Sequence, residues 1–167
     1  IPAKVAPRTS RPGDAPEPGE VIDGYRIEEE IGRGGMGRVY RATHAVTGQQ
    51  VALKMLKPQV ASDRVRERFV NEARLLARLE HENIVPLLGF VDAPRGLFIV
   101  MPFVRGITLE QMLRRQGRLP PPVAAELFCG VCAGVAYLHE HEMLHRDLKP
   151  GNIIVQSDGA PRLTDFG

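Results

Sequence analysis

Three glycines between residues 32 and 37 have the spacing of a phosphate-binding loop. Gly32, Gly34 and Gly37 form a G-x-G-x-x-G pattern, in which backbone amides can approach phosphate oxygens because no side chain intervenes. The same pattern opens dinucleotide-binding folds, but there a helix follows the glycines directly. Residues 38–42 instead read Arg-Val-Tyr-Arg-Ala, which is typical of a strand. We therefore expect a hairpin that covers a nucleotide.

A lysine and a glutamate further along the chain are expected to meet. Lys54 lies within the apolar run 51–56, where a charged side chain needs an anionic partner. Residues 63–79 have the periodicity of an amphipathic helix, and Glu72 falls on its apolar stripe. A carboxylate on a buried face needs a cation. These observations predict a Lys54–Glu72 ion pair, and the alternative is that Glu72 lies at the exposed edge of the stripe.

Two more motifs with charged residues close the sequence. Residues 145–152 read His-Arg-Asp-Leu-Lys-Pro-Gly-Asn, and residues 165–167 read Asp-Phe-Gly. With the glycine-rich segment and the lysine before them, these motifs make the region from Tyr25 to Gly167 resemble the eukaryotic-like protein kinases, and the bacterial serine/threonine kinases most of all. The resemblance implies an α+β, protein-kinase-like fold. A five-stranded antiparallel N-lobe sheet with one helix would precede the first helices and the catalytic loop of the C-lobe.

The resemblance also implies the catalytic roles. Asp147 would orient the substrate hydroxyl and accept its proton as the catalytic base, Lys149 would contact the transferred phosphoryl group, and Asn152 and Asp165 would bind magnesium. A lysine at position 149 favours serine and threonine over tyrosine substrates. The implied catalytic set is Asp147, Lys149, Asn152, Lys54 and Glu72.

The implied cofactors are ATP and Mg²⁺, with Mn²⁺ as an alternative metal. The adenine would lie between Val39 and Ala52 on one side and Ile154 on the other, with Met101 beside the rear pocket. Kinases commonly carry an acidic residue where this chain has Pro102, but only a carbonyl acceptor is required there, and proline retains its carbonyl. The implied nucleotide-binding residues are Ile31, Gly32, Gly34, Gly37, Val39, Ala52, Lys54, Met101, Pro102, Val104 and Ile154.

The residue pattern predicts the elements that must position these groups. Residues 1–20 are rich in proline and are expected to form a disordered leader or linker. The remainder, 21–167, would be a partial protein kinase domain, with the N-lobe over about 21–103 and the start of the C-lobe over 104–167. The predicted strands of the N-lobe cover residues 25–32, 37–44, 50–56, 87–91 and 97–101. In the C-lobe, helices are predicted over 108–115 and about 122–139, and short strands around 153–155 and 162–164.

Composition narrows the functional classes. A net charge of +2 with 25% charged residues gives no strong field, so no nucleic-acid partner is expected. The apolar stretch 123–138 is interpreted as a buried helix, shorter than the roughly 20 residues that a bilayer span requires, so no membrane contact is expected within this segment.

Two cysteines within that stretch favour a reducing, cytoplasmic setting over a disulfide scaffold, and the cytoplasmic domain of a membrane-anchored receptor kinase is an alternative. The oligomeric state stays open.

Two short patterns suggest metal or redox chemistry instead. Residues 141–145 satisfy H-E-x-x-H, the zinc-protease pattern, but His145 also begins the catalytic-loop motif and no third ligand motif is recognisable. Cys129 and Cys132 form a C-x-x-C pair without a second pair, and small residues on a buried helix explain them more simply. We therefore rank both alternatives below the kinase interpretation.

Two functional hypotheses remain for the kinase-like region. In the first, the chain is the front portion of an active kinase that phosphorylates serine and threonine hydroxyls of protein substrates, with Arg146 before Asp147 suggesting control by activation-loop phosphorylation. In the second, the chain is an ATP-binding or regulatory module that phosphorylates nothing. Because the expected activation segment and helical support would follow Gly167, the chain alone is predicted to have little activity.

Overall fold

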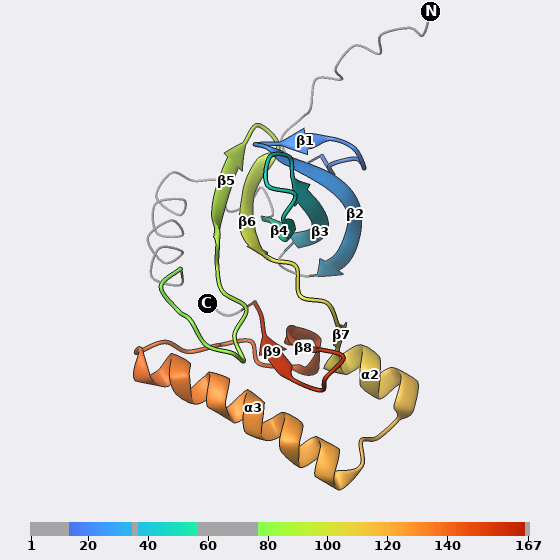
Figure 1. The fold of residues 1–167 in the computed structure, drawn as a ribbon, viewed down its shortest axis with the longest axis vertical. Helices are drawn as coiled ribbons and strands as arrows, with labels where there is room; N and C mark the ends of the chain where they lie inside the picture. Colours follow the sequence, from blue (N-terminus) through green and yellow to red (C-terminus); the bar gives the residue numbers. More distant parts are fainter. Residues whose placement is uncertain (1–13, 35–36, 57–76, 166–167) are drawn as a thin grey trace, which may run out of the picture. The chain divides into compact units, whose positions relative to one another are not determined.

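A computed structural model describes residues 14–34, 37–56 and 77–165 of the chain (Figure 1). The chain divides into two compact units. The first comprises Ile1–Val70 and Gly89–Val100, and the second comprises Asn71–Leu88 and Met101–Gly167. The predicted helix over 63–79 lies almost entirely outside the described residues, as does Glu72.

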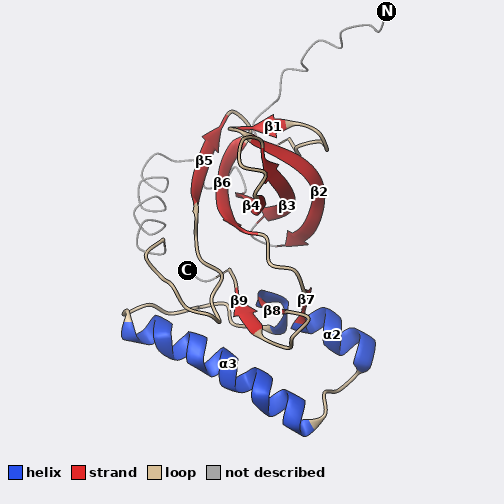
Figure 2. Cartoon of the chain, in the orientation of Figure 1, coloured by secondary structure: helices blue, strands red, loops and turns tan. Residues whose placement is uncertain are grey.

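The first unit is built on a six-stranded sheet with the order β1-β2-β3-β4-β6-β5 (Figure 2). Strand β1 pairs with β2, β2 with β3, β3 with β4 and β5 with β6, all in antiparallel orientation. The strands are β1 (Val21–Ile22), β2 (Tyr25–Gly34), β3 (Gly37–His44), β4 (Gln50–Leu56), β5 (Gly89–Ala93) and β6 (Gly96–Pro102). The five predicted strands are all present, and the sixth is the two-residue β1, too short to show a sequence pattern.

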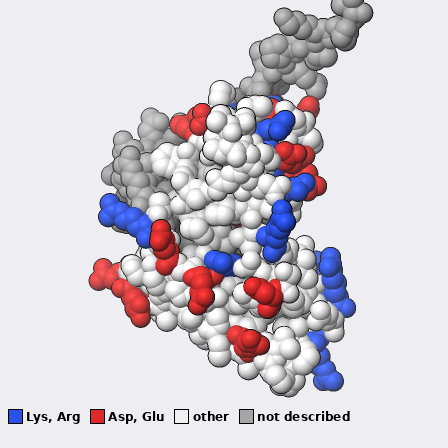
Figure 3. All heavy atoms as spheres, viewed as in Figure 1, with Lys and Arg blue, Asp and Glu red and all other residues white. Residues whose placement is uncertain are grey.

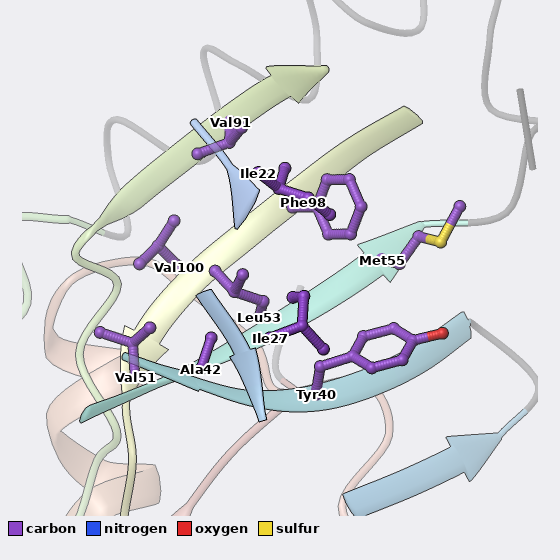
Figure 4. Packing of buried hydrophobic residues seen from close by; sticks show 10 residues of the cluster. All are labelled: Ile22, Ile27, Tyr40, Ala42, Val51, Leu53, Met55, Val91, Phe98 and Val100. Carbon is purple, nitrogen blue, oxygen red and sulfur yellow. The ribbon is translucent and has the colours of Figure 1, made fainter. Parts of the chain in front are cut away.

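The core of the first unit is formed on one face of this sheet. Alternation along the strands sends every second side chain to that face, so all six strands contribute to one apolar cluster. Figure 4 shows these side chains pointing toward one another. Tyr40 and Phe98 are the largest members and are almost fully buried. The cluster contains Ile22, Ile27, Tyr40, Ala42, Val51, Leu53, Met55, Val91, Phe98 and Val100.

The last part of the expected leader is attached to the first unit. Pro16 is buried, and Gly19 donates from its backbone N–H to the carbonyl of Ile27 at 2.8 Å. Arg95, in the turn between β5 and β6, donates from Nε to Glu20 Oε1 at 2.6 Å and from Nη1 to the carbonyl of Ala15 at 3.3 Å. Residues 14–20 therefore contact the first unit, and the expected disorder stays a prediction for residues 1–13, which lie outside the described part of the chain.

The described part of the second unit contains two α-helices and a three-stranded sheet with the order β7-β8-β9. Helix α2 begins after Thr108, which caps it through a reciprocal hydrogen-bond pair with Gln111. The apolar cluster between the helices and the sheet contains Leu109, Leu127, Val131, Ile153, Val155 and Leu163. The elements are β7 (Ile107–Thr108), α2 (Leu109–Gln116), α3 (Pro121–Glu140), the 3₁₀ turn η2 (Pro150–Asn152), β8 (Ile153–Val155) and β9 (Pro161–Leu163).

Helix α3 is buried on one face only. Leu127, Val131, Gly134 and Leu138 are buried, whereas Phe128 is 53% exposed. The interpretation of this stretch as a buried helix was therefore correct for one face and wrong for the other. The helix is 20 residues long, and an 18-residue window within it has a mean hydropathy of 1.5, so length and composition alone would allow it to cross a membrane, and the argument from shortness does not hold.

Asn83 joins the segment 77–88 to the rest of the second unit. Its side-chain amide donates to the carbonyl of Pro161 at 2.9 Å, and its own carbonyl accepts from the N–H of Leu163 at 2.7 Å. Gly130 and Gly134 of α3 lie against Asn83, and a Cβ at Gly134 would come within 2.8 Å of Leu163 Cδ1. The glycines are thus the positions at which α3 approaches this segment and β9 closely.

Candidate phosphoryl-transfer site

The register of the first sheet places three predicted nucleotide-binding side chains on one face. Directly opposite residues in an antiparallel pair point to the same side. Val39 pairs with Lys54, and Arg41 pairs with Ala52. Since Tyr40 pairs with Leu53 and both belong to the core cluster, Val39, Lys54 and Ala52 occupy the opposite face. The first unit therefore groups an aliphatic surface and a cation, as nucleotide binding requires.

Lys54 is only 6% exposed although it carries a charge. Its predicted partner Glu72 lies outside the described residues, so the Lys54–Glu72 pair remains a prediction. A buried ammonium group needs hydrogen bonds and a compensating negative charge. A phosphate group and a carboxylate both meet that need, and the position is therefore suited to an anionic ligand.

The glycine-rich segment closes as a hairpin between β2 and β3. Gly34 pairs with Gly37 and Gly32 pairs with Val39, as expected for a turn between strands rather than a strand-to-helix turn. Gly37 has φ = 154°, and a Cβ there would lie 2.0 Å from the carbonyl oxygen of Met55 in β4. A side chain at position 37 would therefore clash with β4, so glycine is required by the sheet itself as well as by any phosphate. Ile31, 43% exposed, lies in β2 of this hairpin, directly before Gly32.

In the second unit, three of the predicted catalytic residues form one hydrogen-bonded group. Lys149 donates from Nζ to Asp147 Oδ2 at 2.6 Å. Asn152 donates from Nδ2 both to the carbonyl of Asp147 at 2.9 Å and to its Oδ2 at 3.0 Å. Asn152 is buried and is held in η2 by a bond from its N–H to the carbonyl of Lys149 at 2.9 Å. The tight turn begun by Pro150 brings these residues together.

The electrostatics of this loop favour a charged carboxylate beside a neutral imidazole. The hydrogen bond from Lys149 lowers the pKa of Asp147, and the bond from Asn152 adds to the effect. Burial lowers the pKa of His145, which is 4% exposed. Asp147 is therefore ionised at neutral pH, and His145 is neutral and packs within the unit.

Asp165 lies next to this group through a backbone connection. The N–H of Thr164 donates to the carbonyl of Asn152 at 3.0 Å, so the residue before Asp165 is tied to the other predicted magnesium ligand. Asp165 has φ = 61° and Arg146 has φ = 60°, a region that residues other than glycine seldom adopt. Such backbone angles concentrate at functional sites, where the surrounding structure enforces them. The side-chain oxygens of Asn152 and Asp165 are ligands of the kind that Mg²⁺ prefers.

The remaining predicted adenine-binding residues belong to the second unit. Met101 is 9% exposed, and Pro102 and Val104 are half-buried in the strand end and segment that follow. Ile154 lies in β8 opposite Arg162 and Thr108. These predicted residues therefore belong to the second unit, whereas Val39 and Ala52 belong to the first.

The H-E-x-x-H motif does not have the arrangement that zinc chemistry needs. Helix α3 ends at Glu140, so His141 and His145 do not lie one turn apart on a helix, and Glu142 has φ = 59°. Among the described residues, no group of three or more His, Cys, Asp or Glu side chains could hold a metal ion. Cys129 and Cys132 are exposed, so their explanation as parts of a buried surface was wrong.

One cluster near the glycine-rich hairpin was not predicted from the sequence. Glu30 in β2 forms ion pairs with Arg33 and with Arg38, at 2.9 Å and 3.6 Å. The acidic run of residues 28–30 and the two arginines are visible in the sequence, but the faces on which they lie depend on the strand register.

A known protein family matches most of this chain. A sequence model of the family described as Protein kinase domain matches residues 25–167. The serine/threonine-protein kinase PknA of Corynebacterium glutamicum is 36% identical over 149 residues, and PknE of Mycobacterium tuberculosis is 40% identical over 144 residues. Both alignments cover 86% of this chain, but only 32% of PknA and 25% of PknE. The chain thus spans about a third or less of these curated relatives.

Solved structures of kinases also resemble this chain. The kinase domain of Mycobacterium tuberculosis PknI matches with a TM-score of 0.77 and 32% identity, covering 91% of this chain and 63% of that domain. Rad53 residues 1–466, solved in complex with AMP-PNP, matches with a TM-score of 0.77 and 31% identity, covering 86% of this chain and 38% of Rad53. These likenesses confirm the predicted α+β, protein-kinase-like fold. The family match covers most of the chain, which therefore belongs to the protein kinase family.

Proposed function

We propose that this chain carries the nucleotide-binding and catalytic-loop parts of a serine/threonine protein kinase. The observation that carries the proposal is the hydrogen-bonded group of Asp147, Lys149 and Asn152 in the second unit. Phosphoryl transfer passes through a loose transition state, so catalysis depends mainly on positioned cations and one oriented nucleophile. This group supplies a carboxylate, an ammonium and an amide within a span of six residues.

Each residue of the group has a distinct proposed role. The ionised carboxylate of Asp147 orients the serine or threonine hydroxyl of a protein substrate and accepts its proton. Lys149 moves from Asp147 to the transferred phosphoryl group as substrate enters. Asn152 and Asp165 hold Mg²⁺, or Mn²⁺ in its place, which would neutralise charge on the phosphates. The low pKa of Asp147 suits orientation of the hydroxyl more than early removal of its proton.

The first unit supplies the proposed ATP site. Lys54 would contact the α and β phosphates, and Glu72 would hold the lysine in place. The backbone of Gly32, Gly34 and Gly37 would approach the phosphates from the hairpin. Supporting this, Val39, Ala52 and Lys54 share one face of the sheet. The match to the protein kinase family supports this proposal. We further propose that the kinase region acts on protein substrates in the cytoplasm.

The test is phosphoryl transfer from labelled ATP to a protein substrate by the full-length gene product that contains this chain. We expect label on serine and threonine, and loss of at least about a hundredfold in rate for Asp147→Asn, because the hydroxyl is then no longer oriented. Glu110→Gln, which removes an exposed carboxylate on α2, is the matched control. Equal rates for wild type and Asp147→Asn would refute the assigned base. ATP binding without any transfer would favour the alternative of a regulatory ATP-binding module.

A further inference from the structure

Two arginines face each other directly across the glycine-rich hairpin. Arg33 of β2 pairs with Arg38 of β3, one step before the pair Gly34–Gly37 at the end of the hairpin. Like charges directly opposite each other in an antiparallel pair are destabilising. The hairpin therefore carries an unfavourable contact at the position where its strands must stay together.

One carboxylate compensates both arginines. Glu30 Oε1 accepts from Arg33 Nε at 2.9 Å and Oε2 accepts from Arg33 Nη2 at 3.3 Å, so this contact is bidentate. Arg38 Nη1 lies 3.6 Å from Glu30 Oε2. The hydrogen bond from Arg33 lowers the pKa of Glu30, which is consistent with a carboxylate that stays charged between the two cations.

A β-bulge makes this contact possible. Residues three apart on a regular strand point to opposite faces, so Glu30 and Arg33 would not meet. Here Glu30 pairs with Tyr40 and Gly32 pairs with Val39, which leaves Ile31 as an extra residue between the two pairs. The bulge moves Glu30, Arg33 and the Tyr40 side of β3 onto one face.

That face is the one turned away from the proposed nucleotide surface. Tyr40 belongs to the core cluster, whereas Val39 and its partner Lys54 lie on the other face. Arg41 on the nucleotide side has its own partner, Glu29, at 3.0 Å. The group of Glu30, Arg33 and Arg38 therefore stabilises the hairpin from the face opposite the proposed nucleotide surface. It is not placed to contact phosphate.

We propose that Glu30 is a positioning residue for nucleotide binding, which holds Arg33 and Arg38 together so that the hairpin presents its glycines at a fixed register. The inference rests on the proposed ATP site. Without the Glu30 charge, the opposed arginines separate the strands near Gly34 and Gly37. The backbone amides of the hairpin then lose the geometry in which they meet the phosphates.

The test measures MgATP binding to the chain by titration calorimetry. We expect Glu30→Gln to weaken binding by about threefold, the effect of one cross-strand charge contact. Adding Arg33→Gln to that variant should restore binding, because the repulsion is removed with the charge. High salt should also reduce the difference from wild type, since it screens exposed charges. Glu28→Gln is the matched control, because Glu28 lies on the same strand with only a 3.8 Å contact to Arg26.

Several outcomes would overturn the inference. Glu30→Gln binding as tightly as Glu28→Gln would do so, as would a double variant that binds no better than the single one. If Lys54→Met leaves binding unchanged, the proposed ATP site itself is wrong. Hydrogen exchange then still tests whether Glu30 stabilises the hairpin. Glu30→Gln should speed exchange at the amides of Arg38 and Val39 relative to the amide of Leu53, and exchange rates equal to those of wild type would contradict this role.

Discussion

Lys149 Nζ lies 2.6 Å from Asp147 Oδ2, so the proposed base and the proposed phosphoryl-binding lysine contact each other directly. Both side chains are partly exposed, at 55% for Lys149 and 32% for Asp147. The pair is therefore a surface contact that solvent screens, and it can open when a substrate hydroxyl and a phosphoryl group compete for its members. Its value lies in orienting Asp147 rather than in stabilising the fold.

The first prediction concerns the titration of Asp147. The Lys149 hydrogen bond is the main cause of the lowered pKa, so Lys149→Met should raise the pKa of Asp147 toward its usual range. A carboxylate with a lowered pKa adds stability above its unfolded pKa, and this contribution is lost as the pH falls through the folded value. Carbon-13 NMR of the carboxyl carbon in magnesium-free buffer measures the shift. An unchanged pKa in Lys149→Met would show that Lys149 does not control this carboxylate.

The second prediction concerns the close approach at Gly37. Gly37→Ala should destabilise the chain by about 2 kcal/mol or more, because its Cβ would meet the carbonyl of Met55 in a backbone region unfavourable to alanine. Gly48→Ala is the control, since Gly48 has φ = 70° with nothing within 4 Å. That variant should lose only about 1 kcal/mol from backbone strain. Urea unfolding of the full chain compares the two, and equal losses would contradict the clash.

The third prediction concerns the attachment of the leader through Arg95. The side chains of Arg95 and Glu20 are 13% and 25% exposed, so their 2.6 Å contact is better protected from solvent than the other described ion pairs. A double-mutant cycle with Arg95→Ala and Glu20→Ala should give a coupling free energy of about 1 kcal/mol. The exposed pair Arg114–Glu110 serves as the comparison and should couple more weakly. Equal coupling in both cycles would contradict the prediction.

The sequence predicts best what depends on neighbours in the chain. The strand ends at His44 and Gln50 follow from the Thr47-Gly48 turn, and Gly48 adopts the positive φ that such a turn requires. Asp147, Lys149 and Asn152 meet because a short, proline-containing turn holds them, so their motif already implies their contact. The net charge is only +2, and on the face that Figure 3 shows, basic and acidic side chains occur side by side.

Features that depend on distant contacts could not be predicted in the same way. Glu20 and the carbonyl of Ala15 are held because Arg95, far along the chain in the β5–β6 turn, donates hydrogen bonds to both. The bulge at Ile31, which places Glu30 beside Arg33, exists only in the pairing of β2 with β3. Helix α3 carries apolar residues such as Phe128 on its exposed face as well as on its buried face, so the buried face could not be distinguished until Gly134 was seen against β9.

The central claim is tested most directly by magnesium-dependent ATP binding to the chain. Calorimetry with wild type, Lys54→Met and Asp165→Asn separates the phosphate-binding lysine from the metal ligand. We expect saturable binding by wild type, weakened when Mg²⁺ is removed, weakened in Lys54→Met with or without metal, and no longer dependent on Mg²⁺ in Asp165→Asn. ATP binding that is absent, or that is the same in all three proteins with and without Mg²⁺, would contradict the account.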